Sequence, residues 1–176
     1  MATNAVNIGK GNASGMFYYA TSGTAIPTTL ASIPSAWHEA GFISEDGMEL
    51  ELSHDVENIK DWSSTIRRVV MTDHEEKASG SCISTTGDAL AELFGSTNVT
   101  ATTASITVNL SSSDLPAVKA YLFVMKDGDD LLAFGCSEGQ ISVSDNVSFQ
   151  AGEGIAWPFE ITAQGTTGMQ FVKVMG

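Results

Sequence analysis

The amino-acid sequence predicts a mainly β (α+β) fold, in which two antiparallel sheets pack as a sandwich or barrel and one short helix flanks them. Short apolar or β-branched runs recur along the chain and are separated by turns rich in Gly, Asp and Ser. Hydrophobic residues make up 43% of the 176 residues, which lets one domain bury a substantial core without disulfide bonds. The 17 glycines and the many Ser and Thr residues favour strands and turns over helices.

Residues 1–36 lack the periodicity of a strand or a helix. They are rich in Ala, Thr, Ser and Gly, and Pro27 and Pro34 interrupt them. This composition predicts an extended N-terminal arm that needs neighbouring surface to become ordered, with a disordered terminus as the alternative. Residues 37–176 contain no repeat and no shift in composition, so they are expected to form a single β domain.

The segment 48–53 has the clearest strand pattern in the chain. Three apolar residues alternate there with Glu49, Glu51 and Ser53, which is the period of a half-buried strand with one face toward a core and an acidic face toward solvent. The Glu-Asp-Gly sequence at 45–47 precedes it, and an Asp-Gly pair between apolar runs is typical of a hairpin turn. The two flanking runs are therefore expected to pair.

A polar connection of about ten residues is expected next, at 54–64, before a β-branched strand at 65–72. Connections longer than the usual 2 to 5 residues of a hairpin are generally functional or disordered. Trp62 is the large aromatic residue of this segment. Two interpretations of Trp62 stay open: it caps the core of its own chain, or it is an anchor that a partner buries.

From residue 73 onward the sequence predicts a β meander apart from one helix. Residues 73–77 are expected to form a charged turn, and the small residues at 78–85 a strand that pairs back on 65–72. A turn is expected at 126–130. The later strands are expected at 103–110, 117–125, 131–136, 140–144, 147–150, 154–163 and 169–175.

The predicted helix follows Thr85. Thr85 and Asp88 approximate a capping box, and Gly95 stands where a helix commonly ends. The apolar residues of this helix fall on one face, so packing against the core must stabilise it; they are Leu90, Leu93 and Phe94.

The charge of the chain argues against nucleic-acid binding. The net charge is −13, from 21 acidic and 8 basic residues, whereas affinity for phosphates depends on Lys and Arg. The N-terminus has no apolar region of a signal peptide, and no run of 18 apolar residues occurs. Neither secretion nor membrane insertion is indicated.

The sequence also predicts no metal ion and no cofactor. His38, His54 and His74 lie in polar surroundings without a spacing that puts two strong ligands on one face. The acidic run at 127–130 lacks the ligand pattern of a calcium loop and fits a hairpin turn.

No enzyme is predicted, because the sequence contains no nucleophile elbow and no convergent set of polar residues. Cys82 and Cys136 occur in strand-like runs without a Cys-x-x-Cys spacing, so they are expected to be buried, reduced thiols. Glu49 and Glu51 fit a solvated strand face better than a catalytic pair.

An ordered set of segments resembles the major tail tube proteins of long non-contractile-tailed (siphovirus-type) bacteriophages, particularly those that infect actinobacteria. The likeness covers residues 4–95 well, and the remainder resembles them only as a general β pattern. The segments are Gly-Phe-Ile-Ser-Glu-Asp-Gly at 41–47, the acidic alternating strand, Asp-Val-Glu-Asn-Ile-Lys-Asp-Trp at 55–62, Arg-Arg-Val-Val at 67–70, and the flanking segments 23–28 and 89–95.

This resemblance implies a structural protein that self-assembles into stacked homohexameric rings around a hollow conduit for ejection of double-stranded DNA. The expected partners are other copies of the chain, the tail tip or initiator protein, the tail terminator protein and the tape measure protein, with DNA passing through without being bound. The expected location is the tail of the virion, and the host cytoplasm during assembly.

Two sets of site residues follow from the resemblance together with the patterns above. Glu49 and Glu51 are expected to line the bore, because they point away from the core side of their strand. The connection 54–64 is expected to make the contact between rings. Its candidate residues are Asp55, Glu57, Ile59, Lys60, Asp61 and Trp62.

A β-sandwich binding module of the carbohydrate-binding or adhesin type is the alternative function. Such a module needs an exposed aromatic platform, and the three tryptophans, Trp37, Trp62 and Trp157, do not cluster in the sequence.

Overall fold

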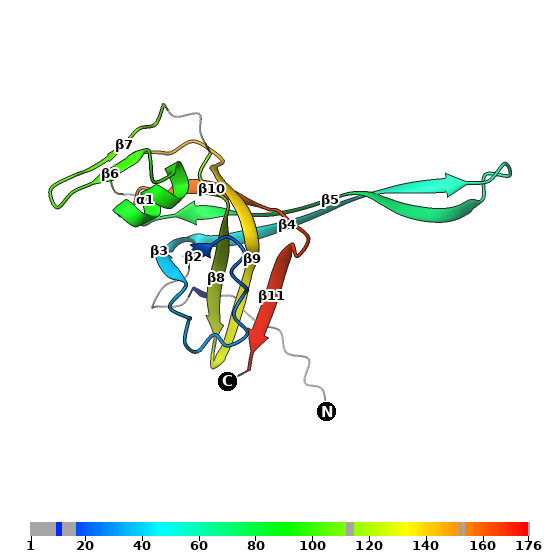
Figure 1. Ribbon diagram of the computed structural model, residues 1–176, viewed down its shortest axis with the longest axis horizontal. Helices are drawn as coiled ribbons and strands as arrows, with labels where there is room; N and C mark the ends of the chain where they lie inside the picture. Colours follow the sequence, from blue (N-terminus) through cyan, green and yellow to red (C-terminus); the bar gives the residue numbers. More distant parts are fainter. Residues whose placement is uncertain (1–9, 12–16, 112–114, 151, 153, 176) are drawn as a thin grey trace.

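A computed structural model describes residues 10–11, 17–111, 115–150, 152 and 154–175. Within them the chain forms one α-helix and eleven strands (Figure 1). The elements are β1 (Lys10–Gly11), β2 (Phe17–Thr21), β3 (His38–Gly41), β4 (Ile43–Lys60), β5 (Ile66–Cys82), α1 (Gly87–Phe94), β6 (Val99–Ala101), β7 (Ile106–Val108), β8 (Lys119–Asp127), β9 (Asp130–Val143), β10 (Trp157–Ala163) and β11 (Met169–Val174).

The strands form two antiparallel sheets. The larger sheet has nine strands in the order β3-β2-β8-β9-β10-β5-β4, with β1 paired to β8 and β11 paired to β9. The smaller sheet consists of β6 and β7 and lies beside α1 (Figure 1). The structure therefore confirms the predicted fold class: a mainly β protein with two antiparallel sheets and one short helix.

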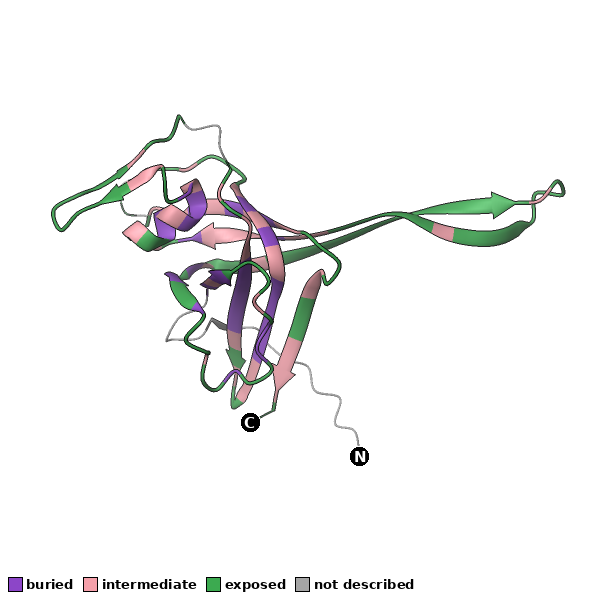
Figure 2. Ribbon diagram, in the orientation of Figure 1, coloured by how far each residue is buried: buried purple, intermediate pink, exposed green. Residues whose placement is uncertain are grey.

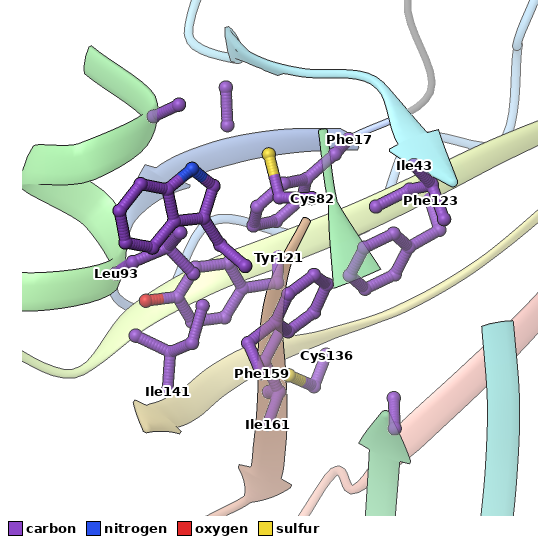
Figure 3. Packing of buried hydrophobic residues seen from close by; sticks show 14 of the residues in the cluster. Phe17, Ile43, Cys82, Leu93, Tyr121, Phe123, Cys136, Ile141, Phe159 and Ile161 are labelled. Carbon is purple, nitrogen blue, oxygen red and sulfur yellow. The ribbon is translucent and has the colours of Figure 1, made fainter. Parts of the chain in front are cut away.

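Aromatic side chains from distant parts of the chain form the centre of the core (Figure 3). Phe17 stacks on Phe123 and Phe159, with ring centroids 4.9 and 5.2 Å apart. Cys82 and Cys136 are buried and free, as the sequence predicts. Burial raises the pKa of the Cys136 thiol to about 11, so the thiol stays protonated at neutral pH and packs as a small apolar group.

The segment 17–36 contributes buried residues to both faces of the large sheet, Phe17 to this core and others to a second cluster. β2 lies between β3 and β8, and Ile26 and Leu30 are buried against the other face of the sheet. The extended arm expected at 1–36 thus includes a sheet strand from Phe17 on, and residues 1–9 and 12–16 lie outside the described residues. Small and aromatic residues of β2 pack well between two neighbouring strands, although their sequence shows no simple alternation.

The helix begins one residue later than the capping box predicts. Thr86, not Thr85, is the N-cap, and its hydroxyl accepts a hydrogen bond from the Ala89 amide at 3.2 Å. The Thr85 hydroxyl instead accepts a hydrogen bond from the indole of Trp157 at 3.3 Å. The apolar face packs against the core as expected, and Gly95 ends the helix with a φ of 87°.

Two of the predicted turns are wrong. Residues 45–47 are a bulge within β4, because Ile43 pairs with Cys82 and the next pair is Met48 with Gly80. Residues 73–77 lie inside β5 and pair with β4. In both cases the polar residues lie on a strand and are exposed to solvent, so their polarity does not require a turn.

Three strand boundaries also differ from the prediction. The expected strands 131–136 and 140–144 are one continuous strand, β9, and 103–110 contains only the short β7. Residues 147–150 form no strand. The predicted turn near 126–130 is confirmed as the tight β8–β9 connection, in which Asp127 pairs with Asp130 and Gly128 has a φ of 60°.

The long hairpin of β4 and β5 leaves the body of the domain and projects far beyond it (Figure 1). The predicted polar loop at 54–64 is wrong, because residues 54–60 continue β4 and pair with β5 as far as Ile66. The turn occupies only residues 61–65. A polar sequence without alternation is compatible with a strand here because both faces of the hairpin are exposed (Figure 2).

Candidate functional site

The outer part of the β4–β5 hairpin consists of two strands only. β10 pairs with β5 from Lys77 to Cys82, and no third strand of the described residues extends beyond that point. We call residues 52–76 the arm; from Leu52 to the turn it spans about 30 Å at the rise of an extended strand. A two-stranded ribbon is marginally stable in water by itself. The arm therefore needs a stabilising surface that the described residues do not supply.

One face of the arm is apolar. Side chains that lie directly opposite each other across the hairpin share a face, and the pairs Leu52–Glu76, His54–His74 and Val56–Met71 begin this face. The pair Asn58–Val69 continues it toward the tip. Its large apolar side chains are all exposed; they are Leu52, Val56, Ile66, Val69 and Met71. A row of exposed, large apolar side chains along one face is typical of an interaction site.

The opposite face of the hairpin is acidic. The pair Asp55–Asp73 lies on it. Thr72 is the extra residue of a β-bulge between this pair and the pair Val56–Met71, so the apolar and acidic faces continue past the bulge. The carboxylates of this face are Glu49, Glu51, Asp55, Glu57, Asp73 and Glu75. Lys77 partly balances them, since its amine lies 3.2 Å from Glu75 and 3.7 Å from Glu160 of β10. Glu75 chiefly, and Glu160 after it, raise the pKa of Lys77, so the lysine stays charged.

Glu49 and Glu51 lie at the base of the hairpin, on the acidic face. The opposite side of the same strands carries Met48, which packs against the core, and Ala78, which is fully buried. The two carboxylates are exposed and point away from the core, as their alternation predicts. Leu50, by contrast, is 41% exposed, although the pattern predicts a core position for it. The strand leaves the body of the domain at this residue, so the apolar side chains of β4 are exposed to solvent from there on.

The tip of the arm is held by Asp61. Its carboxylate accepts hydrogen bonds from the Ser63 hydroxyl at 2.6 Å, the Thr65 amide at 3.0 Å and the Arg67 guanidinium at 2.6 Å. These bonds lower the pKa of Asp61, the Ser63 hydroxyl most of all. They also hold Ser64 at a φ of 62°, a conformation that only a fixed turn maintains in a non-glycine residue.

Trp62 follows Asp61 and is fully exposed at this tip. The interpretation in which Trp62 caps the core of its own chain is therefore wrong. The basic residues Lys60, Arg67 and Arg68 surround the turn, whereas Asp61 is its one carboxylate. The tip is thus locally basic on a chain whose net charge is −13.

The predicted site residues divide between three positions on this hairpin. Asp55 and Glu57 lie on the acidic face, Ile59 and Lys60 end β4, and Asp61 and Trp62 form the turn. Sequence reasoning missed the apolar residues of β5 as functional residues. The signal was present, because Val69 and Met71 stand two residues apart between the polar Arg68 and Thr72, but the same pattern also fits an ordinary core strand.

A second feature of the hairpin is its free edge. β4 ends the strand order of the large sheet, so the described residues provide no partner for its outer edge over 18 residues. A long unpaired edge is a template for pairing with another chain. The bulge at 45–47 interrupts this edge near the body only.

Other surface features of the described residues do not form a comparable site. Trp37 and Trp157 are buried, so the tryptophans provide no exposed aromatic platform. A pocket of about 620 Å³ lies beside α1 and includes Phe94, Phe149 and Trp157 in its lining. The structure contains no cluster of three or more metal-ligating side chains in its described part. No helix of that part is long and apolar enough to span a membrane.

Comparison with known proteins gives one result that covers nearly the whole chain. Residues 1–175 match a protein family described as phage tail tube protein. No curated protein matches the sequence.

Proposed function

The chain belongs to the phage tail tube protein family, and on that premise we propose that it forms stacked hexameric rings whose bore conducts double-stranded DNA. Membership makes it a structural protein of the phage tail that assembles with itself and with other tail proteins. The ring, the bore and the orientation of each subunit are the proposed part. They rest chiefly on one observation, the two-faced hairpin of β4 and β5.

The hairpin has the properties of a strand pair built for a shared barrel. Its outer edge is long and unpaired in the described chain, its apolar face is uncovered, and its other face is acidic. Pairing of neighbouring hairpins around a ring would close these edges, as a barrel does. A closed ring of identical subunits is also the usual way for a soluble chain to satisfy such an interface.

We assign the acidic face to the bore. A conduit for DNA must not adhere to it, and carboxylates such as Glu49 and Glu51 repel phosphates. Screening limits this repulsion to about 8 Å at physiological ionic strength, so it acts on DNA close to the wall. The apolar face then packs against the outer layer of a neighbouring subunit, where Leu52, Val56 and Met71 lose their contact with water.

The tip of the arm is proposed to make the contact between successive rings. The arm reaches about 30 Å beyond the body, so its tip lies far enough from its own subunit to meet a neighbouring ring. The basic tip suits the acidic surface of another copy of this chain. Trp62 and Ile59 supply the apolar anchor, and Lys60 and Asp61 lie beside them. Asp55 and Glu57 belong to the proposed bore instead of this contact.

The remaining parts of the proposal follow from the role in the tail. The protein acts as a scaffold without catalysis or a cofactor, and its further partners are the tail tip or initiator, the terminator and the tape measure proteins. Assembly takes place in the host cytoplasm. A carbohydrate-binding or adhesin module has no support from the arrangement of the tryptophans, two of which are buried.

Electron microscopy of the purified full-length protein tests this proposal. We expect hollow tubes or six-fold rings at high protein concentration, with more tubes when a tail-tip complex is added. A cryo-EM map should place the acidic face of β4 and β5 toward the axis. A protein that stays monomeric by light scattering with and without the initiator contradicts the assembly. A map with Glu49 and Glu51 on the outer surface contradicts the orientation.

A further inference from the structure

We propose that His54 and His74 form a binding site for a divalent transition-metal ion of the kind that favours imidazole nitrogen, with Cu²⁺ and Ni²⁺ the best fits. The two residues are 20 positions apart in the sequence but pair directly across β4 and β5, on the apolar face of the arm. Their Nδ1 atoms lie 2.6 Å apart, and their ring centroids lie 4.5 Å apart. This site is a property of the single chain and does not depend on ring assembly.

The protons of the two rings can be assigned from their partners. Nε2 of His74 lies 2.8 Å from Oε1 of Glu76, so it carries a hydrogen and donates it to this carboxylate. The Nδ1 atom of a neutral His74 then has a free lone pair, which accepts a hydrogen bond from Nδ1 of His54. A metal ion takes the place of this one hydrogen. The proton moves from Nδ1 to Nε2 of His54, so both rings stay neutral and both Nδ1 lone pairs meet the ion.

Glu76 orients the site without being a ligand itself. A carboxylate that accepts the second N–H of a metal-binding histidine fixes its tautomer and raises its basicity. The other oxygen of Glu76 accepts a hydrogen bond from the Met169 amide, so the carboxylate is held from the body of the domain. The His74 ring is therefore already aimed at His54 before any ion binds.

The two Nδ1 atoms are close enough for one ion to bind both after a small separation of the rings. With metal–nitrogen bonds of about 2.0–2.1 Å, two ligands at a right angle are about 2.9 Å apart, and two ligands at a tetrahedral angle are about 3.3 Å apart. The observed 2.6 Å is closer to the right-angle value. Right-angle coordination is typical of the tetragonal sites of Cu²⁺ and Ni²⁺. Because the described residues include no third ligand nearby, water completes the coordination.

An ion at this position would clamp the middle of the arm. It would join β4 to β5 next to the bulge at Thr72, where the regular ladder of hydrogen bonds is interrupted. An ion that binds only when the two strands are paired stabilises the paired state, because binding shifts the equilibrium toward it.

The test is calorimetric titration of the full-length, EDTA-treated protein with CuCl₂ and with NiCl₂ at pH 7.5. We expect one ion per chain, with binding at least ten-fold weaker in His54→Gln and in His74→Gln. The matched control is His38→Gln, which makes the same change on β3 and should bind as the wild type does. Glu76→Gln keeps an acceptor oxygen but removes the charge, and should weaken binding about 10- to 100-fold.

Binding by the His54 and His74 variants that is as tight as binding by the wild type, or no saturable binding by the wild type, overturns the proposal. Circular dichroism verifies that each variant is folded. Electron paramagnetic resonance of the Cu²⁺-loaded wild type gives an answer that needs no variant: coupling to two imidazole nitrogens is expected, and coupling to one or none contradicts the site.

Discussion

Val69 and Val70 are neighbours on β5 but lie on opposite faces of the arm, Val69 opposite Asn58 on the apolar face and Val70 opposite Glu57 on the acidic face. The same substitution at the two positions therefore separates the roles of the two faces. Val69 is 58% exposed, so a polar residue there removes little from the core of the single subunit.

We expect Val69→Asp to block tube formation and Val70→Asp to permit it. Val69→Asp places a carboxylate in an interface from which assembly excludes water, and burying this charge is costly. Val70→Asp only adds one more carboxylate to the acidic wall of the bore. Val69→Asp should keep the unfolding free energy of the monomer within about 0.5 kcal/mol of the wild type, as exposed substitutions usually do. Val70 is half-buried, so Val70→Asp should cost about 1 kcal/mol. Negative-stain microscopy and a urea melt measure the two effects. Tubes formed equally well by both variants would show that the apolar face has no part in assembly.

Replacing both Glu49 and Glu51 with Lys reverses the charge of the proposed bore. Tubes should still form, because these side chains face away from the core and from the apolar face. Genome ejection should become slow, and added salt should partly restore it, because phosphate contacts weaken as salt rises. The measurement is DNA release from phage that carry the double variant at several salt concentrations. Glu49→Gln with Glu51→Gln is the uncharged control, and ejection by the Lys variant at the wild-type rate would contradict the assignment.

Trp62→Ala should leave the subunit fold unchanged and stop elongation of the tube. Trp62 has no burial in the subunit to lose, so the melting temperature should stay within about 1–2 °C of the wild type. The contact between rings loses its aromatic anchor, and rings or short stacks should replace long tubes. Thermal melts and microscopy provide the two readouts. Trp62→Phe keeps an apolar ring and should retain part of the elongation.

Gly135→Ala should destabilise the subunit strongly, because β9 approaches β8 closely there. An added Cβ would overlap the Tyr121 carbonyl and lie 3.0 Å from the Cα of Leu122, and neither backbone atom can move aside alone. We expect a loss of about 2 kcal/mol or more, the range of overpacked cores. Gly154→Ala is the control, since a Cβ there meets open space. Urea denaturation compares the two variants, and equal midpoints would contradict the close approach.

Glu92→Gln should change how stability depends on pH. Glu92 is buried; Lys119 bonds one carboxylate oxygen, and the other has no hydrogen-bond partner among the described residues. Burial raises the pKa of this carboxyl above its ordinary value of 4.5, although Lys119 acts in the opposite direction. A raised folded-state pKa gives stability that is present below pH 4.5 and is lost as the pH rises through the folded-state value.

The glutamine variant lacks this loss. The difference in unfolding free energy, variant minus wild type, should therefore increase between pH 4 and pH 7. Urea melts at a protein concentration too low for assembly measure this difference. A constant difference would show that the ion pair with Lys119 balances the burial of Glu92, and a difference that falls with pH would show that the ion pair outweighs it.

The sequence by itself determined the class of fold, the central strand at 48–53, the helix near residue 90 and the burial of both cysteines. These features depend on local periodicity or on the apolar character of single residues, which tertiary contacts reinforce here. The alternation around Glu49 and Glu51 also gave the correct outward direction of these two carboxylates.

Only the tertiary structure decided that 54–60 and 73–77 lie in strands and that Phe17 begins a strand between β3 and β8. A turn and a solvated two-stranded ribbon have the same polar composition, so residue type alone does not separate them. The pairing of His54 with His74 depends on a register shifted by bulges, and register is a relation between two strands. The arm is long and exposed in the single subunit, and in the proposed assembly its stabilising surface belongs to another molecule, which no pattern within one chain contains.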